Sequence, residues 1–451
     1  MYLFHIRTYG CQMNERDSEA LSCLLEAYGH QSVTEEESAD VLIFNTCSVR
    51  DQAERKVLGK IGIMKRLKAQ KPALKIGIIG CMAQRLGESL FEKLPHVDFV
   101  VGTGQMNQVP EFFTRIAAGE THLSALSLEV EEAELSGHQE QSLTSYISVM
   151  RGCDQFCTYC IVPHTRGREK SRPIPDIVKE VREQVDGGSR EVLLLGQNIT
   201  AYGVAEARKE GIYTPEFSAF ADLLQALQEI PGLLRIRFTS PHVRYMNQKF
   251  IETVCRLPKV CKAFHIPLQS GSNRMLAAMN RGYTAEEYLQ CIEGIRSLAP
   301  QAVFSTDIIV GFPGETREEF EQTRQVMHQV QYDMAYIFRY SQREGTRAAK
   351  TLNDDVPENE KMERNQILLS ELSEGVEKRN KAYLGKTVEV LLEGKSKRNE
   401  ERWTGRTDLN KVCIFPPAED IAPGQLCQVK IRRTTSNSLF GDIMETKRQG
   451  E

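Results

Sequence analysis

The sequence predicts a mixed α/β protein built from an N-terminal doubly wound α/β domain, a central partial barrel of six βα units and a small C-terminal β-barrel. Apolar strand-like stretches alternate with amphipathic helical patterns in the first part of the chain, and this alternation resumes after an acidic segment. The last part holds only short strand patterns. Alternating strands and helices favour parallel sheets with right-handed crossovers, whereas short strands alone favour a small barrel or sandwich.

The N-terminal domain is predicted over residues 1–120, with a helix over 17–28 and strands over 3–9, 41–46, 76–80 and 99–102. Cys11, Cys47 and Cys81 each follow one of the first three strands. Because the carboxyl ends of parallel strands share one edge of a sheet, these cysteines are expected to lie close together. Three unrelated buried cysteines are the alternative, since a free thiol packs well as a small apolar group.

The central domain is predicted over residues 144–379, after an acidic, turn-rich linker over 121–143. Its six expected strands cover residues 146–150, 192–195, 234–238, 263–268, 303–310 and 335–340. Six units are fewer than the eight that close a full barrel, so an open, partial barrel is expected. Catalytic loops in such folds lie at the carboxyl ends of the strands.

The C-terminal domain is predicted over residues 380–447, with strands over 387–392, 412–415, 426–432 and 440–444. In the third strand, Cys427, Val429 and Ile431 alternate with polar or basic residues, which predicts one buried and one solvent-facing side. The chain has a net charge of -4, yet this segment carries more Lys and Arg than Asp and Glu. A local basic surface is therefore expected, although a solvated edge strand is also compatible with the pattern.

The most specific motif is the C-x3-C-x2-C spacing of Cys153, Cys157 and Cys160. Structural zinc and ferredoxin-type 4Fe-4S clusters take four protein ligands, so three thiolates leave one iron open to a small molecule. A zinc site completed by a distant histidine, or three unmetallated thiols, are the alternatives. His164, His242 and His265 are more typical of hydrogen-bonded structural residues.

Composition indicates a cytoplasmic protein with reduced thiols and no membrane segment. The chain has 451 residues, is 41% hydrophobic and 26% charged, and contains no apolar run long enough for a membrane span. Its twelve cysteines are thinly spread, which favours metal ligation over a disulfide framework. Six of them occupy apolar positions and are expected to pack in the core: Cys23, Cys255, Cys261, Cys291, Cys413 and Cys427.

Taken together, the motifs resemble those of the methylthiotransferase family of radical S-adenosylmethionine (SAM) enzymes. The similarity covers nearly the whole chain, and the C-terminal domain resembles the RNA-binding TRAM domain. The matching stretches are 8–19 (TYGCQMNERDSE), 45–50 (NTCSVR), 80–85 (GCMAQR), 151–168 (RGCDQFCTYCIVPHTRGR), 196–198 (GQN), 265–272 (HIPLQSGS) and 307–316 (DIIVGFPGET).

The resemblance implies two 4Fe-4S clusters, a SAM-binding one on Cys153, Cys157 and Cys160 and an auxiliary one on Cys11, Cys47 and Cys81. One SAM would provide a 5'-deoxyadenosyl radical and another a methyl group, so that a methylthio group is added to C2 of N(6)-dimethylallyladenosine next to the anticodon of tRNA. Side-chain acid-base chemistry offers no route to that C-H bond, whereas cofactor radical chemistry does.

Candidate contacts follow from strand ends and from charge. The SAM candidates are Tyr159, Gln197, Ser240, Gln269, Arg281 and Asp307, and the tRNA candidates are Arg166, Arg168, Arg172, Lys397, Arg398, Arg402 and Arg432. Residues 311–315 are a further candidate segment for contacting SAM, but a turn that precedes a helix explains their sequence equally well. Trp403 is compatible with either base stacking or the barrel core.

Three other functions share these motifs: methylthiolation of threonylcarbamoyladenosine in tRNA, methylthiolation of an aspartate in a small-subunit ribosomal protein, and a non-catalytic iron-sulfur scaffold that binds RNA. The residues flanking Cys11, Cys47 and Cys81 favour the dimethylallyladenosine enzyme. A monomer is expected, together with a flavodoxin or ferredoxin type of reductant.

Overall fold

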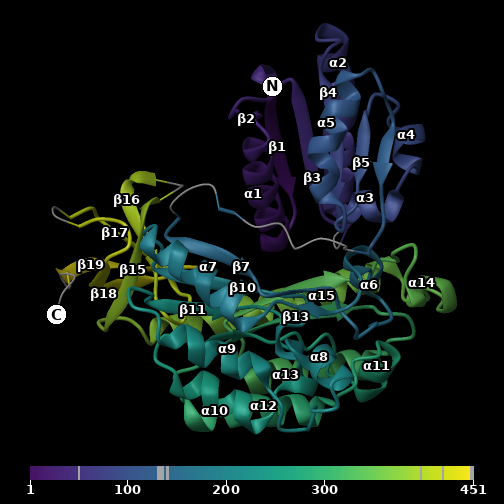
Figure 1. The fold of residues 1–451 in the computed structure, drawn as a ribbon. Coiled ribbons are helices and arrows are strands. Elements are labelled where there is room, and N and C mark those ends of the chain that lie inside the picture. Colours follow the sequence, from purple (N-terminus) through teal and green to yellow (C-terminus); the bar gives the residue numbers. More distant parts are fainter. Residues whose placement is uncertain (49–50, 130–136, 139–141, 397–398, 419–420, 447–451) are drawn as a thin grey trace. The chain divides into compact units, whose positions relative to one another are not determined.

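The computed structural model describes residues 1–48, 51–129, 137–138, 142–396, 399–418 and 421–446. It divides into two compact units (Figure 1). Unit 1 comprises residues 1–140, 151–169 and 343–346, and unit 2 comprises residues 141–150, 170–342 and 347–451. The segment with the C-x3-C-x2-C motif therefore belongs to the same unit as the N-terminal domain.

Unit 1 contains a six-stranded parallel sheet in the order β2-β1-β3-β4-β5-β6. Its strands are β1 (Leu3–Tyr9), β2 (Gln31–Ser32), β3 (Val41–Thr46), β4 (Lys75–Gly80), β5 (Phe99–Val101) and β6 (Leu123–Ala125). The short edge strands β2 and β6 were not predicted, because two or three residues carry no clear periodicity. Strand β6 lies inside the segment that the sequence indicated as the linker.

Helices cover both faces of this sheet, which confirms the doubly wound fold. They are α1 (Gln12–Ala27), α2 (Asp51–Gln70), α3 (Cys81–Leu86), α4 (Ser89–Lys93) and α5 (Val109–Ala117). Leu42 and Ile78 pack with α2 on one face, whereas Ile43 and Phe99 pack with α1 and α5 on the other. The strands are thus buried on both faces, as parallel strands usually are.

Unit 2 contains six consecutive parallel strands in two three-stranded sheets. The first holds β7 (Thr144–Ser148), β10 (Glu191–Leu195) and β11 (Arg235–Phe238), and the second holds β12 (Ala263–His265), β13 (Val303–Val310) and β14 (Met334–Arg339). A bridge between Ile236 and Val260 links them, and one hydrophobic core spans both. The partial (βα)6 barrel is therefore confirmed.

The described part of unit 2 contains nine α-helices. They are α7 (Ile174–Asp186), α8 (Val204–Lys209), α9 (Ala219–Gln228), α10 (Gln248–Arg256), α11 (Asn273–Ala278), α12 (Ala285–Leu298), α13 (Arg317–Val330), α14 (Arg347–Thr351) and α15 (Glu358–Lys381). Seven of them, all but α8 and α14, contribute buried residues to the barrel core. Two short strands, β8 (Met150–Arg151) and β9 (Lys170–Ser171), pair where the chain passes between the units. No described helix has both the length and the hydropathy needed to cross a bilayer.

The C-terminal part of unit 2 is a closed five-stranded barrel, ordered β15-β16-β17-β19-β18. Its strands are β15 (Thr387–Ser396), β16 (Asn399–Arg406), β17 (Val412–Phe415), β18 (Leu426–Thr434) and β19 (Leu439–Thr446). Strand β16 was missed because its residues are mostly polar, although it pairs with both β15 and β17. The expected alternation in β18 is confirmed, since Cys427, Val429 and Ile431 are buried.

Candidate functional site

Cys11, Cys47 and Cys81 lie at the carboxyl edge of the unit 1 sheet. Cys11 follows β1, Cys47 follows β3 and Cys81 opens α3 directly after β4. Strand order reverses between β1 and β3, because the chain first adds β2 on one side of β1 and then adds β3 on the other. A ligand site is expected at such a reversal, so the topology places these cysteines where an open α/β sheet binds ligands.

A buried amide network holds these three loops together. The Asn14 side chain donates to Asn45 Oδ1 at 2.9 Å, and the Asn45 side chain donates back to the Asn14 carbonyl at 2.8 Å. Asn14 Oδ1 also accepts from the backbone N–H of Cys11. Gly80 has φ +93°, and a Cβ there would lie 2.5 Å from Asn45 Oδ1, so this close approach requires glycine. The sequence reasoning overlooked both asparagines.

Arg166 reaches the same place from helix α6 (Val162–Arg166). Its guanidinium is buried and lies 2.7 Å from Asp17 Oδ2 of α1. Helix α6 packs against α3, and the Thr103 hydroxyl donates to the Thr165 carbonyl at 2.5 Å. The interpretation of Arg166 as a tRNA contact is therefore wrong, because its charge is inside unit 1 and already paired.

Cys11 interacts with the other two thiols, and the Arg166 charge acts on Cys11 and Cys81. A hydrogen bond with Cys47 lowers the pKa of Cys11 to about 6, with help from the Arg166 charge and against the effect of burial. Burial raises the pKa of Cys81, and Arg166 opposes that rise. No three potential ligand side chains among the described residues converge on one metal ion. An iron-sulfur cluster has a different requirement, since each thiolate binds a separate iron. Three cysteines that form no disulfide, with Arg166 beside two of them, fit that requirement.

The C-x3-C-x2-C segment forms a compact loop in unit 1. The backbone N–H of Cys153 donates to the Gly167 carbonyl at 3.1 Å, and the N–H of Cys160 donates to the Cys157 carbonyl at 3.0 Å. Gly152 has φ +78°, and a Cβ there would lie 2.0 Å from the Arg168 carbonyl. Only glycine therefore allows the two ends of this loop to meet.

The three thiols of the loop interact electrostatically. Burial raises the pKa of Cys153 far above its usual value, and the neighbouring thiols of Cys160 and Cys157 contribute to the rise. A bound cation would reverse this effect, because a coordinating thiol is deprotonated. The donor set therefore suits an electropositive cluster, whereas isolated thiolates would be unstable here.

Several predicted SAM contacts lie just beyond the carboxyl ends of the unit 2 strands. Gln197 follows β10, Ser240 follows β11 and Gln269 follows β12. Ser240 and Gln269 have φ of 61° and 71°, unusual for residues other than glycine and typical of strained functional sites. Asp307 lies within β13, where its carboxylate is 3.4 Å from His265 Nε2. Tyr159, the sixth candidate, belongs to unit 1.

The same edge contains buried polar atoms that lack a hydrogen-bond partner within the described structure: Gln197 Oε1, Asn198 Nδ2 and His242 Nε2. Leaving such an atom unpaired costs about 1–3 kcal/mol, so a polar ligand would recover that free energy. The Arg281 guanidinium is buried nearby and donates to the Tyr283 hydroxyl at 3.1 Å. Asn198 and Tyr283 were not predicted, and for His242 the sequence favoured a hydrogen-bonded structural role.

The 311–315 segment is a turn and helix start, one of the two possibilities that the sequence left open. Thr316 caps α13 in a capping box with Glu319. Glu315 accepts from the Gly311 N–H at 2.6 Å and from Arg364 at 2.7 Å. These contacts account for the polar groups of the motif without a ligand.

The remaining predicted tRNA contacts have different surroundings. Arg168 is exposed, lies over the Phe156 ring and pairs with Asp154. Arg172 pairs with Glu180 at 2.6 Å, and Arg432 pairs with Asp442 at 3.1 Å. Arg402 is exposed on β16, and Trp403 is half-buried against the barrel core. Lys397 and Arg398 lie outside the described residues.

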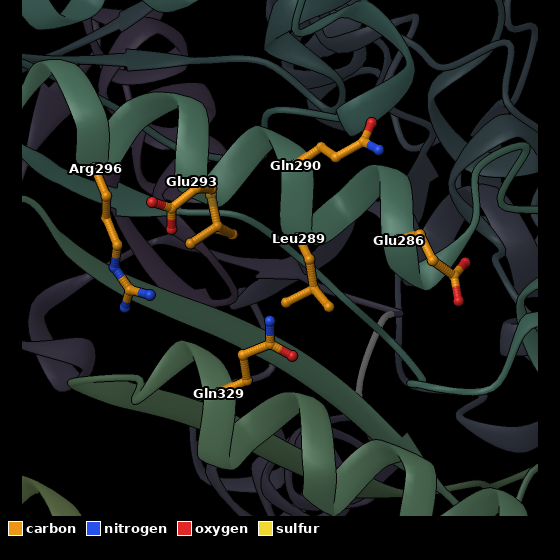
Figure 2. A pocket seen from close by; sticks show the side chains of 7 residues that line it. Glu286, Leu289, Gln290, Glu293, Arg296 and Gln329 are labelled. Atoms are coloured by element: carbon orange, nitrogen blue, oxygen red, sulfur yellow. The ribbon is translucent and has the colours of Figure 1, made fainter.

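A shallow groove between α12 and α13 contains none of the predicted site residues. Figure 2 shows its lining side chains, which include Leu289, Glu293 and Arg296 of α12 and Gln329 of α13. These residues lie on the helical layer and not at the carboxyl ends of the strands, where ligands of βα folds bind. We assign this groove no role.

Three family models match successive parts of the chain. Residues 3–102 match the model described as Uncharacterized protein family UPF0004, residues 147–327 match the Radical SAM superfamily, and residues 381–444 match the TRAM domain. The order of the three matches follows the order of the three predicted domains.

Curated relatives cover almost the full length of the chain. The tRNA-2-methylthio-N(6)-dimethylallyladenosine synthase of Opitutus terrae is 44% identical over 98% of this chain and 97% of its own. The enzyme with the same name from Carboxydothermus hydrogenoformans is also 44% identical, over 97% of both chains. Among solved structures, the radical SAM methyltransferase TsrM of Kitasatospora setae superposes with a TM-score of 0.55 at 12% identity, covering 77% of this chain and 74% of its own, which supports the fold alone.

Proposed function

Since the chain belongs to the tRNA-2-methylthio-N(6)-dimethylallyladenosine synthase family, we propose that it is a radical SAM methylthiotransferase that acts on C2 of N(6)-dimethylallyladenosine next to the anticodon of tRNA. The observation that carries this proposal is the presence in unit 1 of two separate sets of three cysteines that form no disulfide. One set lies at the carboxyl edge of the N-terminal sheet, and the other lies in the 151–169 segment.

Each cysteine set has a defined part in the proposal. Cys153, Cys157 and Cys160 would hold the SAM-binding 4Fe-4S cluster, and Cys11, Cys47 and Cys81 would hold the auxiliary one. When bound, these groups and two SAM molecules supply reductive SAM cleavage, hydrogen abstraction from C2 and transfer of a methylated sulfur. The fold supports the scheme because both sets occupy loops whose backbone is held by neighbouring residues.

The carboxyl edge of the central barrel supplies the polar groups for SAM. Gln197, Asn198 and His242 present buried atoms without partners in the described structure, and Arg281 adds a buried positive charge. Burial lowers the pKa of His242 well below its usual value, and Arg281 and Arg244 add to the effect. His242 is therefore neutral, and because its Nδ1 accepts from the Arg244 N–H at 3.3 Å, its Nε2 carries the proton and can donate a hydrogen bond to a ligand.

The substrate and the electron source follow from charge and chemistry. Exposed basic residues such as Arg168 and Arg402 can contact tRNA phosphates. We further propose a monomeric cytoplasmic enzyme that receives electrons from a flavodoxin or ferredoxin type of protein.

Iron analysis of anaerobically purified protein tests the two-cluster assignment. The full chain should carry about eight irons, and Cys153→Ala should lose about half of them together with SAM cleavage. Cys47→Ala should lose the other half but retain cleavage. Cys261→Ala, at a buried cysteine away from both sets, is the control and should keep all the iron. Zinc, or only four irons, in the unaltered protein would contradict the assignment.

Isotope transfer tests the reaction itself. With an anticodon stem-loop that carries deuterium at C2 of the prenylated adenosine, turnover should place deuterium in 5'-deoxyadenosine. Release of S-adenosylhomocysteine should not depend on the RNA. Full turnover without deuterium in 5'-deoxyadenosine would point to another substrate, namely a different modified adenosine or a protein aspartate.

A further inference from the structure

We propose that the ion pair between the buried Arg166 and the half-buried Asp17 sets the reduction potential of the cluster that Cys11, Cys47 and Cys81 would hold. This inference rests on the proposed function, because it presumes that these cysteines bind an iron-sulfur cluster. It assigns to Arg166 the role of a positioning residue that places one positive charge beside the cysteines.

The geometry holds the Arg166 guanidinium in one place. The side chain is 6% exposed, and its Nη2 lies 2.7 Å from Asp17 Oδ2. Asp17 is on α1, six residues after Cys11, and Arg166 ends α6, which packs against the helix that begins at Cys81. The hydrogen bond from Thr103 to the Thr165 carbonyl fixes the backbone next to Arg166.

The charge acts directly on the cysteines. Arg166 makes a hydrogen bond with the Cys81 thiol and a Coulombic interaction with Cys11. An arginine stays charged at all accessible pH values, and its field is stronger in a buried site than in water. One-electron reduction adds a negative charge to a cluster, so a nearby guanidinium favours the reduced state and the Asp17 carboxylate opposes it.

Stability alone does not explain this pair. Burying the Arg166 charge costs desolvation free energy that a single ion pair often does not return, and an apolar residue of similar size is often equally stable. Arg166 also lies only six residues after Cys160. The segment that carries the SAM-cluster cysteines thus contributes a charge to the auxiliary site, and one unit contains both.

Redox titration of the auxiliary cluster alone tests the proposal. The full-length chain with Cys153, Cys157 and Cys160 all replaced by Ala retains one possible cluster, whose potential is followed by electron paramagnetic resonance. Arg166→Met should shift the potential to more negative values, whereas Asp17→Asn should shift it to more positive values. The double variant should return toward the parent, and Arg166→Lys should stay close to it.

A remote arginine of the same unit provides the matched control. Arg115 on α5 pairs with Glu120 at 2.7 Å in solvent, so Arg115→Met should leave the potential unchanged. If Arg166→Met fails to load iron, the potential of Asp17→Asn still tests the proposal, because this variant keeps the positive charge of Arg166. Unchanged potentials, or shifts of the same sign in both single variants, would overturn the inference while the two-cluster assignment stands. Absence of a cluster from the parent would instead overturn the proposed function.

Discussion

At the scale of single residues, the auxiliary site depends on side chains that carry no obvious chemistry. Asn14 and Asn45 exchange hydrogen bonds beneath the cysteine loops, and both are fully buried. A buried amide is stable only when its donors and acceptors are paired, so each asparagine depends on the other. Together they link β1, β3 and α1 at the point where the cysteines lie.

We expect Asn45→Ala to lower the free energy of unfolding by about 2–3 kcal/mol, because it removes three buried hydrogen bonds, two with Asn14 and one with Ser18. Urea denaturation measures the loss, and iron content should fall with it. Gln31→Ala, on the exposed edge strand β2, is the control and should change neither quantity. A loss of less than about 0.5 kcal/mol in Asn45→Ala would show that water replaces the network.

A second residue-scale prediction concerns pH. Burial, together with Arg281 and Arg244, lowers the folded-state pKa of His242 well below the usual 6.5. The unfolded chain therefore binds a proton that the folded chain does not, so this contribution to stability is complete above about pH 6.5 and is lost as the pH falls below it.

Urea unfolding between about pH 5 and 7 should thus show a shallower pH dependence in His242→Gln than in the unaltered chain. His164→Gln, at an exposed histidine of α6, is the control and should keep the original slope. Equal slopes in all three proteins would mean that the pKa of His242 does not change on unfolding.

At the scale of elements, the C-x3-C-x2-C loop has little regular structure and depends on a closure between its two ends. Asp154 and Glu169 exchange hydrogen bonds from each backbone N–H to the other side chain, at 3.0 and 3.2 Å. Gly152 provides the positive φ and the space for the Arg168 carbonyl. The loop that carries the three cysteines is therefore held closed by contacts between its own ends.

Gly152→Ala should disturb this closure, since the added Cβ would lie 2.0 Å from a backbone oxygen at a strained φ. We expect the variant to lose about half of its iron and to lose SAM cleavage, while the auxiliary cluster remains. Iron analysis and the yield of 5'-deoxyadenosine measure the two effects. Gly211→Ala, at a positive φ with open space, is the matched control. Full iron content in Gly152→Ala would show that the loop can close without glycine.

At the scale of the whole molecule, the C-terminal barrel is attached firmly to the central barrel within unit 2. Arg235 donates to the Arg406 carbonyl at 2.6 Å, and Arg237 donates to the Thr407 carbonyl at 2.8 Å. In the opposite direction, Nζ of Lys411 in the C-terminal barrel lies 3.3 Å from Oδ2 of Asp333 in the central barrel. Deleting the C-terminal domain would leave Arg235 and Arg237 without these partners, so point variants test RNA binding better than truncation.

Arg402→Ala should weaken tRNA binding by a few fold. It should also lower the slope of log K against log salt concentration by about one, because one counterion fewer is released on binding. The physical reason is that an exposed guanidinium on β16 can neutralise one phosphate. Fluorescence anisotropy with a labelled anticodon stem-loop at several salt concentrations measures both changes. Arg115→Ala, at an exposed arginine of unit 1, is the control. Identical slopes for Arg402→Ala and the unaltered chain would place the RNA elsewhere.

Much of this protein could be inferred from the sequence by itself, because periodicity and spacing are local properties. The alternation of strands and helices predicted the doubly wound sheet, and the count of six βα units predicted the partial barrel. The spacing of Cys153, Cys157 and Cys160 predicted a shared site within one loop. The missed elements β2, β6 and β16 are short or polar, so local hydrophobicity did not reveal them.

Only the tertiary structure decided which distant side chains share a site. The bonding of Asn14 to Asn45, and of Arg166 to Asp17, joins residues far apart in the chain. The sequence indicated Arg166 as a surface contact for tRNA, since charge alone does not reveal whether a side chain is buried. Burial and pairing arise when helices pack, and packing of α6 against α3 turned a basic residue into part of the cysteine site.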